Sequence, residues 1–330
     1  MSKLNGRYVV AARTALAVML CSVEPALAAQ PMDYPSRPIR LLVGFNPGGG
    51  ADITARTVGE KLSERLGQSI IVDNRPAAGG VLARSMAAEA VPDGYTLLIL
   101  SASDVISAAL VQGKPVDMRK TFAGISTVTI YPYVLSTNPS LPIKTVKDLI
   151  AYAKSKPDAI NYGSTGVGTE AHLASELLNY MAGIRTTHIP YKGAAPGLIA
   201  LVGGEIQMLF SSALSAMPHI KAGRVRLLGS SASKRLQSLP DVPTIAESGL
   251  PGFDVTGMYG IIAPAKTPQP IIAKLNYSIG EILKQPEVQQ SMARNATQAT
   301  YTTPQELTAM VEHVEQKWRK LVNDTGLKLE

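Results

Sequence analysis

Cysteine and histidine are scarce in this chain. Its 330 residues include one cysteine, Cys21, and four histidines, at positions 172, 188, 219 and 313. The histidines do not have the spacing of metal ligands, and Cys21 lies in a segment that we expect to be removed, so a zinc site is not expected. The sequence predicts no cofactor and no disulfide, and a mature chain that depends on a buried hydrophobic core.

The sequence also lacks long apolar runs. No segment reaches the roughly 18 consecutive apolar residues that a membrane helix needs. The N-terminus instead has the pattern of an export signal: basic residues from Lys3 to Arg13, a short apolar stretch, and a small-x-small cleavage site ending at Ala28. We expect residues 1–28 to be removed and the remainder to be periplasmic. A lipid anchor on Cys21 is disfavoured because a bulky leucine precedes it.

Charge is mildly unbalanced and not concentrated. The chain has 32 Lys and Arg against 25 Asp and Glu, a formal charge of +7. The densest basic groups, at 221–226 and 317–320, are short, so nucleic acid is not an expected partner. A modest positive excess attracts small anions instead. We expect a monomer.

Two stretches of the sequence, 40–80 and 160–197, repeat one pattern. Each has an apolar strand, a Gly-rich loop, a helix, a glycine, a second strand and a second Gly-rich loop. The loops before the two helices are 46–50 and 163–168. A helix N-terminus carries unpaired backbone N–H groups and partial positive charge, so it can bind an anion. The repeat therefore predicts two lobes that hold one anion between them.

Strands and helices alternate along the whole chain, which predicts an α/β fold with largely parallel sheets flanked by helices. A strand at 125–135, broken at Pro132, is the expected crossover out of the first lobe. The helices at 270–284 and 304–323 are expected to return to the first lobe, which gives two crossings and a hinge. Expected strands are 39–45, 69–73, 95–100, 159–162, 186–190, 206–210, 225–230 and 259–263. Further expected helices are 51–66, 81–90, 169–182, 198–202 and one ending near 222.

Polar side chains in the two repeats and after two buried strands are the candidate ligand contacts. Asp52 is expected to be a helix N-cap, with a direct role toward the ligand as the alternative. Hydroxyls beyond the strand ends are expected at the sheet edge where ligands bind. His172 is expected to be packed or solvent-facing rather than to line the cleft. The candidate hydroxyls are those of Ser164, Thr165 and Thr169, as caps or ligand contacts, and of Ser101, Ser103, Ser211 and Ser212 after strands.

Two other functions are disfavoured by missing residues. A phosphate-binding loop needs a lysine directly after its glycines, and none follows until Lys61. The G-x-G-x-x-A match at 166–171 lacks the acidic residue that would hold a ribose. A nucleophile elbow at Ser164 fails because Tyr162 stands where a glycine is needed. The sequence therefore predicts a binding protein and not an enzyme, and an exported hydrolase using Ser164 is the alternative.

Short segments in a fixed order resemble the Bug-type solute-binding proteins of tripartite tricarboxylate transporters, from about residue 34 to 326. The resemblance implies a two-lobed periplasmic "Venus flytrap" that delivers an organic carboxylate to a membrane permease. Lobe 1 would comprise residues 29–131 and 255–330, and lobe 2 residues 132–254. A binding subunit that feeds a signalling protein is a further alternative. The segments are YPSRPI (34–39), NPGGGAD (46–52), NRP (74–76), PDGYTL (92–97), YGS (162–164), PYKG (190–193), PHIKAG (218–223), DVPT (241–244) and AP (263–264).

The same resemblance implies which residues hold the ligand. In the family, the loops matching 46–52 and 164–169 bind one carboxylate, largely through backbone groups and waters. This chain departs from the usual family pattern at Met258, Ser211 and Asp104. An Asp104 carboxylate in the cleft would disfavour a second negative charge on the ligand nearby. The predicted ligand-binding residues are Phe45, Pro47, Gly49, Gly50, Asp52, Ser101, Ser103, Ser164, Thr165, Gly168, Thr169 and Ser211.

Overall fold

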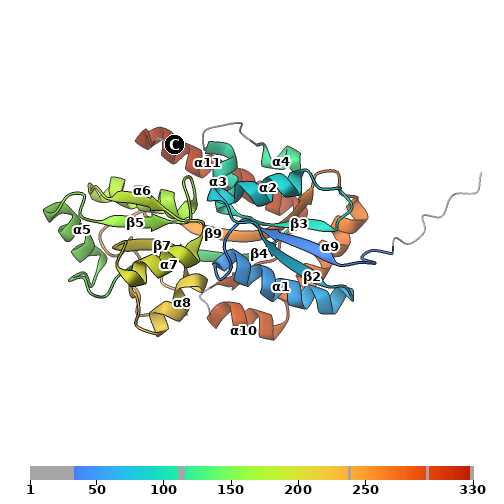
Figure 1. The fold of residues 1–330 in the computed structure, drawn as a ribbon, viewed down its shortest axis with the longest axis horizontal. Helices are drawn as coiled ribbons and strands as arrows, with labels where there is room; N and C mark the ends of the chain where they lie inside the picture. The colour runs from blue at the N-terminus through green and yellow to red at the C-terminus, as the bar shows by residue number, and fades with distance from the viewer. Residues whose placement is uncertain (1–32, 111–115, 237–238, 295–296, 328–330) are drawn as a thin grey trace, which may run out of the picture. The chain divides into compact units, whose positions relative to one another are not determined.

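One long strand, β4 (Phe122–Thr137), connects the two halves of the sheet (Figure 1). The structure, a computed structural model, describes residues 33–110, 116–236, 239–294 and 297–327. The predicted export signal, residues 1–28, lies outside these ranges. The other strands are β1 (Ile39–Val43), β2 (Ile70–Asn74), β3 (Thr96–Ser101), β5 (Asn161–Ser164), β6 (Thr187–Pro190), β7 (Met208–Ser212), β8 (Arg226–Ser230), β9 (Thr256–Pro264) and β10 (Gln298–Ala299).

Helices connect these strands and cover both faces of the sheet. No helix in the described ranges combines the length and the apolarity needed to cross a bilayer. The helices are α1 (Gly50–Leu66), α2 (Val81–Ala88), α3 (Ala102–Leu110), α4 (Met118–Thr121), α5 (Val146–Ser155), α6 (Glu170–Ala182), α7 (Ala194–Gly203), α8 (Ala213–Lys221), α9 (Gln269–Leu283), α10 (Pro286–Arg294) and α11 (Pro304–Thr325), with a 3-10 turn at Ala78–Gly80.

The strand order is β2-β1-β3-β9-β4-β7-β5-β6, and β8 and β10 also pair with β4. The predicted parallel pairs are present at β1–β2, β1–β3, β5–β6 and β5–β7. However, β9 is antiparallel to β3, and β4 is antiparallel to each of its partners. The sheet is therefore mixed rather than largely parallel, because the two long central strands run against their neighbours.

The predicted break at Pro132 does not occur, since β4 continues through it. Its pairing with β9 ends at Pro132, opposite Thr256, and its pairing with β7 begins at Tyr133, opposite Ser212. A proline has no N–H to donate to a strand ladder, so it is tolerated where a strand exchanges one partner for another. Pro132 thus marks the change of partner inside one continuous strand.

The repeated pattern in the sequence is confirmed as two β–loop–α–β units, β1-α1-β2 and β5-α6-β6. In each unit the helix ends at a glycine in the left-handed region, Gly67 with φ 67° and Gly183 with φ 60°. A residue with a Cβ is strained in that conformation, which is why glycine closes both helices. In α1 the buried side chains Ala51, Ala55 and Val58 follow the helical period.

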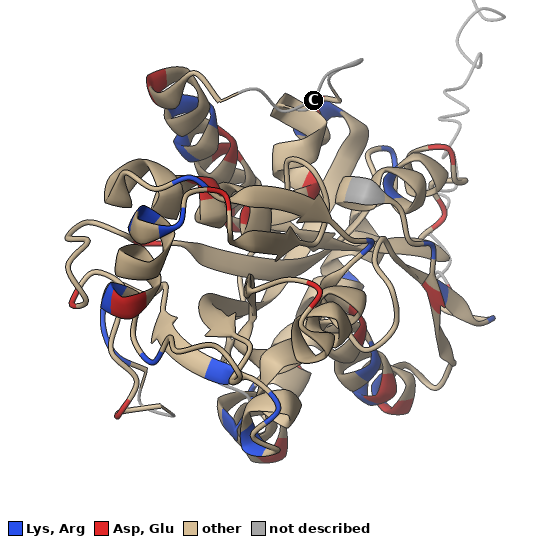
Figure 2. Cartoon of the chain, turned by 60° about the vertical axis from the view of Figure 1, so that its left-hand side comes forward, with Lys and Arg blue, Asp and Glu red and all other residues tan. Residues whose placement is uncertain are grey.

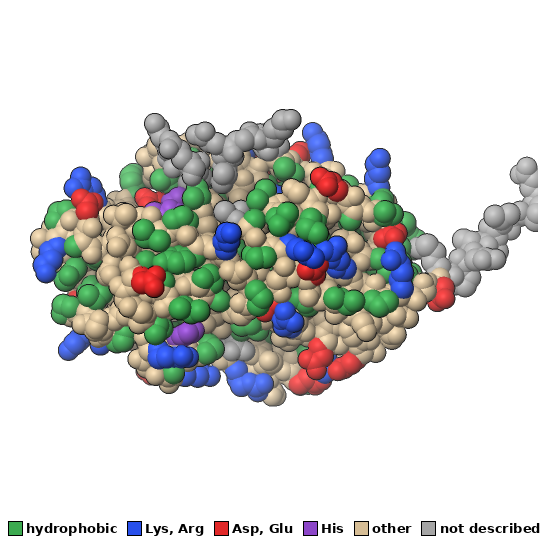
Figure 3. Space-filling model, viewed as in Figure 1, with side chains coloured by type: hydrophobic (Ala, Val, Ile, Leu, Met, Phe, Trp, Pro, Cys, Tyr) green, Lys and Arg blue, Asp and Glu red, His purple; other side chains and the backbone are tan. Residues whose placement is uncertain are grey.

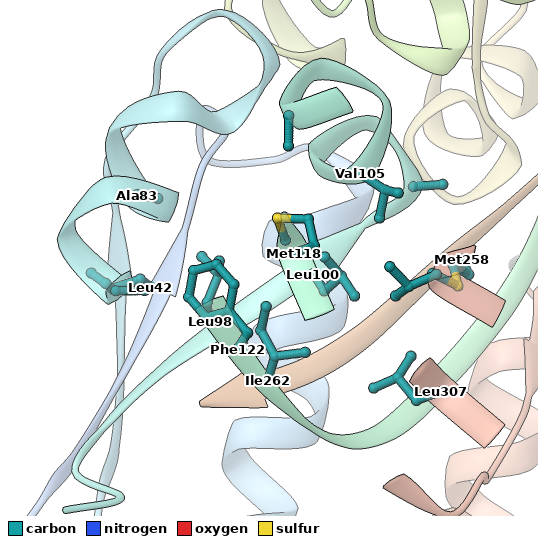
Figure 4. Packing of buried hydrophobic residues seen from close by; sticks show 14 residues of the cluster. Leu42, Ala83, Leu98, Leu100, Val105, Met118, Phe122, Met258, Ile262 and Leu307 are labelled. Atoms are coloured by element: carbon teal, nitrogen blue, oxygen red, sulfur yellow. The ribbon is translucent and has the colours of Figure 1, made fainter. Parts of the chain in front are cut away.

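Two hydrophobic clusters hold the sheet and helices together. The first contains alternating residues of β3, Leu98 and Leu100, with Phe122, Ile262 and Leu307 from β4, β9 and α11 (Figure 4). The second lies around β7 and α7 and includes Leu209, Leu198 and Leu201. Charged residues lie mostly on helices and loops (Figure 2), and both signs are scattered over the face of the molecule seen in Figure 3.

The C-terminal helices α9 and α11 pack against elements of the predicted first lobe. Helix α9 contacts α1, and α11 contacts α3 and β4. The predicted apolar face of α11 is confirmed, since Leu307, Val311 and Trp318 are buried. Helices α3, α4, α5 and α10 were absent from the sequence prediction. α5 carries a capping box of Thr145 and Asp148 that a closer reading of the sequence would have found.

Candidate functional site

A cavity lies where several strands end at their carboxyl termini. It encloses about 370 Å³, the open space at its mouth included. None of the described residues that line it carries a charged side chain. Among the described residues, no group of three or more His, Cys, Asp or Glu side chains could hold a metal ion. The lining residues are Phe45, Gly49, Gly50, Ala51, Ser101, Ser103, Tyr131, Tyr133, Thr165, Ala194, Ser212 and Tyr259.

Four helices begin at this cavity: α1, α3, α7 and α8. Helices α1 and α7 begin after Gly49 and Gly193, and neither has a capping side chain at its N-terminus. The loops before these two helices touch, because the Asn46 N–H donates to the Lys192 carbonyl at 3.2 Å. Helix N-termini carry partial positive charge and first-turn N–H groups without helical partners. The wall of the cavity is therefore electropositive without a cationic side chain.

The α1 N-terminus lies very close to the opposite wall. A Cβ placed on Gly50 would lie 2.5 Å from Ser212 Oγ and 2.6 Å from Tyr259 Oη. Both distances are shorter than real Cβ contacts, so only glycine fits at this position without a shift of its neighbours. Ser212 caps α8 by accepting the Ser215 N–H.

Three tyrosines form the remaining wall. Tyr131 stacks on Tyr259 at a centroid distance of 4.5 Å and lies 5.6 Å from Tyr133. Burial raises the pKa of all three hydroxyls, so they are neutral and can donate or accept hydrogen bonds at neutral pH. None of the three was predicted from the sequence to contact the ligand. The available signal was the i, i+2 spacing of Tyr131 and Tyr133, which places both on one face of β4.

The structure brings half of the predicted site residues to the cavity wall. The other half lie outside the wall, so a direct contact by their side chains stays a prediction. On β7 the residue at the wall is Ser212, while Ser211 pairs with Val134 and its Oγ is buried without a partner among the described residues. The residues at the wall are Phe45, Gly49, Gly50, Ser101, Ser103 and Thr165; those outside it are Pro47, Asp52, Ser164, Gly168, Thr169 and Ser211.

Asp52 is not the N-cap of α1, which is Gly49. The Asp52 carboxylate accepts hydrogen bonds from the Gly48 N–H at 2.9 Å and from Arg56 Nε at 3.0 Å. Burial raises the pKa of Asp52, but the bonds from Arg56, Gly48 and Asn74 outweigh it and lower the pKa. Through the bond from Gly48, the Asp52 carboxylate ties the loop before α1 to the first turn of the helix. The prediction failed because Asp52 lies in the first turn, where its side chain reaches back into the loop.

The sequence left the position of Asp104 open, and the structure places it away from the cavity wall. It lies in the first turn of α3, where its carboxylate accepts both the N–H and the hydroxyl of Ser101, at 2.8 and 2.6 Å. Burial raises its pKa, and Arg84 Nη1 lies 3.9 Å from Oδ1. Asp104 therefore fixes the start of α3 and is absent from the cavity wall.

The loop before α6 is held by its own side chains. Thr169 is the N-cap, as the sequence analysis considered, and its hydroxyl donates to the Gly166 carbonyl at 2.7 Å. Ser164 Oγ bonds both the Gly166 carbonyl and His188 Nε2, at 3.0 and 2.6 Å. His172 is packed, as predicted, and its Nδ1 accepts the Gly168 N–H at 3.1 Å. Thr165 is the residue of this loop that lines the cavity.

The Ser164–His188 pair has the separation of a nucleophile and its base, but it is not at the cavity. Ser164 is completely buried, and the pair lies behind the loop. We expect Ser164→Ala to destabilise the fold by about 1–3 kcal/mol, because it leaves buried groups without partners, and to leave ligand affinity nearly unchanged. Ser175→Ala, which removes a buried hydroxyl bonded only to the Ala171 carbonyl, is the matched control. Equal urea midpoints for the two variants would contradict this role of Ser164.

Comparisons with known proteins place these features in a family. The family model described as "Tripartite tricarboxylate transporter family receptor" matches residues 54–327. Protein BugT of Bordetella pertussis is 34% identical over 319 residues, which covers 95% of this chain and 98% of BugT. The structure titled "R. palustris Rpa4515 with adipate" has a TM-score of 0.87 and 31% identity, and covers 89% of this chain and 99% of its own. MatC from Rhodopseudomonas palustris with bound malate has a TM-score of 0.84 and 31% identity, and covers 88% of this chain and 100% of its own.

Proposed function

Because the chain belongs to the tripartite tricarboxylate transporter receptor family, we propose that its cavity binds a small organic carboxylate for delivery to the permease of such a transporter. The family consists of periplasmic solute-binding receptors and not of enzymes, and the chain has their α/β periplasmic binding protein fold. The observation that carries the proposal is the meeting of four helix N-termini at a cavity without a charged wall residue.

The electrostatics of the cavity favour an anion. Ionised carboxylates are stabilised at helix N-termini by backbone N–H groups and by the helix dipole, at up to about 1–2 kcal/mol per terminus. A cationic ligand would find no carboxylate among the described wall residues to pair with, and burying an unpaired charge is costly. A carboxylate therefore fits this wall better than an amine does.

We propose that the ligand has a polar group at each end. One carboxylate would lie at the α1 N-terminus near Gly49, Gly50 and Thr165. The far end would reach the tyrosine hydroxyls, which can donate to a second carboxylate or a carbonyl oxygen. Two relatives carry such molecules, adipate in Rpa4515 and malate in MatC.

We further propose that the ligand closes two lobes, residues 29–131 with 255–330 and residues 132–254, around itself. The change of strand partner in β4 between Pro132 and Tyr133 supports a hinge at this point. Both sides contribute to the wall, Gly50 from one lobe and Ser212 from the other. A ligand that contacts both lobes stabilises the closed state in proportion to its extra contacts there.

We propose that the chain is exported and cleaved near Ala28. The measurement is the intact mass of the protein recovered from the periplasm, which is expected to correspond to a chain that begins within two residues of position 29. A mass that includes residues 1–28 would contradict cleavage.

A thermal-shift and calorimetric screen tests the binding function. The panel is acetate, malate, adipate and citrate, with adipamide as the uncharged control for adipate. A ligand at about 100 times its Kd is expected to raise the unfolding free energy by about 2.7 kcal/mol, because it binds only the folded state. Stabilisation by at least one carboxylate and none by adipamide supports the proposal. No binding by any carboxylate, or equal binding of adipate and adipamide, would contradict it.

A further inference from the structure

A carboxyl group lies directly behind the tyrosine wall. Glu170, the first residue of α6, is completely buried, and its Oε2 lies 3.2 Å from Tyr133 Oη. Its backbone N–H donates to Ser103 Oγ at 3.1 Å. Tyr133 and Ser103 both line the cavity. Glu170 is therefore separated from the ligand space by a single hydrogen-bonded residue.

The second carboxyl oxygen of Glu170, Oε1, has no hydrogen-bond partner among the described residues. A buried ionised carboxylate normally accepts several hydrogen bonds, and one with a single partner is strongly disfavoured. A protonated carboxyl at this place needs only one acceptor, and Tyr133 Oη is in position. The geometry therefore fits the neutral acid better than the carboxylate.

The groups that face Glu170 do not reverse this preference. Burial raises the pKa of Glu170 to about 8, against the opposing effects of the Tyr133 hydrogen bond and of Lys317. Lys317 donates to the Asp254 carbonyl at 3.2 Å, so its ammonium group is engaged elsewhere. The titratable groups that interact with Glu170 are Tyr131 and Tyr133 on β4, Tyr259 on β9 and Lys317 on α11, and Asp104 on α3 acts in turn on Tyr259.

The Tyr133 hydroxyl has one proton, and the state of Glu170 decides where that proton goes. When Glu170 is ionised, Tyr133 must donate to it, and its oxygen presents lone pairs to the cavity beside a buried negative charge. When Glu170 holds a proton on Oε2, that proton is donated to Tyr133 Oη, and the Tyr133 proton is available to the cavity. Only in the second arrangement does the Tyr133 hydroxyl itself offer an anionic ligand a donor.

We propose that Tyr133 is a ligand-binding donor of this receptor and that Glu170 is the positioning residue which, by keeping its proton, turns the Tyr133 hydroxyl toward an acceptor oxygen of the ligand. This inference rests on the proposed carboxylate binding. Its consequence is that ligand and proton bind together: loss of the Glu170 proton weakens the ligand, and the ligand makes Glu170 harder to ionise. The covalent bonds of the ligand do not change, and the proton that Glu170 takes up comes from solvent.

The test is calorimetric titration with adipate and malate between about pH 6.5 and 9.5, in buffers of different ionisation enthalpy. Both probes are fully ionised over this range, so their own titration does not contribute. Above pH 8 we expect the affinity of the full chain to fall by up to about tenfold per pH unit, with the uptake of close to one proton per bound ligand. At pH 6.5 no proton uptake is expected.

Three variants separate this mechanism from a general effect of pH. Glu170→Gln cannot ionise and should bind at pH 9 nearly as it does at pH 7, without proton uptake. Tyr133→Phe should bind more weakly at pH 7 by about tenfold, because it removes the donor. Glu176→Gln is the matched control, since Glu176 forms the other Glu–Tyr pair of α6, with the Tyr162 hydroxyl, away from the cavity. It should retain the pH dependence of the unmodified chain.

The outcomes distinguish the two proposals. A constant affinity from pH 7 to 9.5, or a pH dependence that persists in Glu170→Gln, would overturn the role of Glu170 while leaving carboxylate binding intact. Unchanged affinity in Tyr133→Phe would overturn the role of Tyr133. The absence of binding at every pH would overturn the proposed function and this inference with it.

Discussion

Gly50→Ala is expected to reduce the affinity for a bound carboxylate by about tenfold to a hundredfold while the protein stays folded. The added Cβ would lie 2.5 Å from Ser212 Oγ and 2.6 Å from Tyr259 Oη, so one wall of the cavity must move. Forcing a methyl group into a packed site costs about 1–3 kcal/mol, and 1.4 kcal/mol is a factor of ten in Kd. The movement displaces the α1 N-terminus or the residues opposite it, beside which the carboxylate is proposed to lie.

Gly197→Ala, in the interior of α7 and outside the cavity wall, is the matched control. Its Cβ would be 3.5 Å from both Cδ atoms of Leu209, which are ordinary contacts. Calorimetry on both purified variants, with circular dichroism as a check on folding, should show a large loss of affinity for Gly50→Ala only. Equal affinities for the two variants would show that the close approach at Gly50 does not shape the site.

The sequence was sufficient to predict the two β–loop–α units and the loops that bring Gly49, Gly50 and Thr165 to the cavity. Gly-rich loops at helix starts are local features, and local features can be read from a short window of sequence. The resemblance to a family then indicated that the two loops face each other. Neither source of information identified the tyrosines, because Tyr131 and Tyr259 are 128 positions apart and meet only through the pairing of β4 with β9.

Acidic residues were the least predictable part of the site. Asp52 was predicted to be an N-cap from its place beside a loop, and the role of Asp104 was left open, yet each lies in a first helical turn and bonds backward into the chain. Glu170 was not selected at all, although it follows the predicted loop directly. Its importance arises from burial and from the missing partner of Oε1, which depend on side chains of β4 and α3 that only the folded chain brings together.

The stability of the ligand-free protein is expected to pass through a maximum between about pH 6 and 7. On the acid side, the loss of stability comes from two buried histidines, His172 and His188. Their rings stack at a centroid distance of 4.0 Å as neutral partners. Burial lowers the pKa of His172 to about 4, and burial together with His172 lowers that of His188 to about 3. On the alkaline side the cause is Glu170, whose pKa burial raises to about 8.

The sign follows from the protons bound by each state. Below pH 6.5 the unfolded chain protonates both histidines and the folded chain does not, so stability falls as pH decreases toward 4. Above pH 4.5 the unfolded chain loses the Glu170 proton and the folded chain keeps it up to pH 8, so stability falls as pH rises. Each proton that one state binds and the other does not changes the free energy of unfolding by about 1.4 kcal/mol per pH unit. Between pH 4.5 and 6.5 these two histidines oppose Glu170, so these three groups together contribute a slope of about one proton.

Two substitutions should change this curve in opposite ways. Glu170→Gln should remove the loss of stability above pH 7. It should also about double the slope of stability against pH on the acid side, because the proton differences of the two histidines are then no longer opposed by that of Glu170. His188→Gln, which can still bond Ser164, removes one of these proton differences and should leave stability nearly flat between about pH 4.5 and 6.5. Urea unfolding at pH 4.5, 5.5, 6.5, 7.5 and 8.5 measures all three curves. If Glu170→Gln left both slopes unchanged, Glu170 would be ionised in the folded protein at neutral pH, and its carboxylate would have to find a second partner that the buried Oε1 does not have.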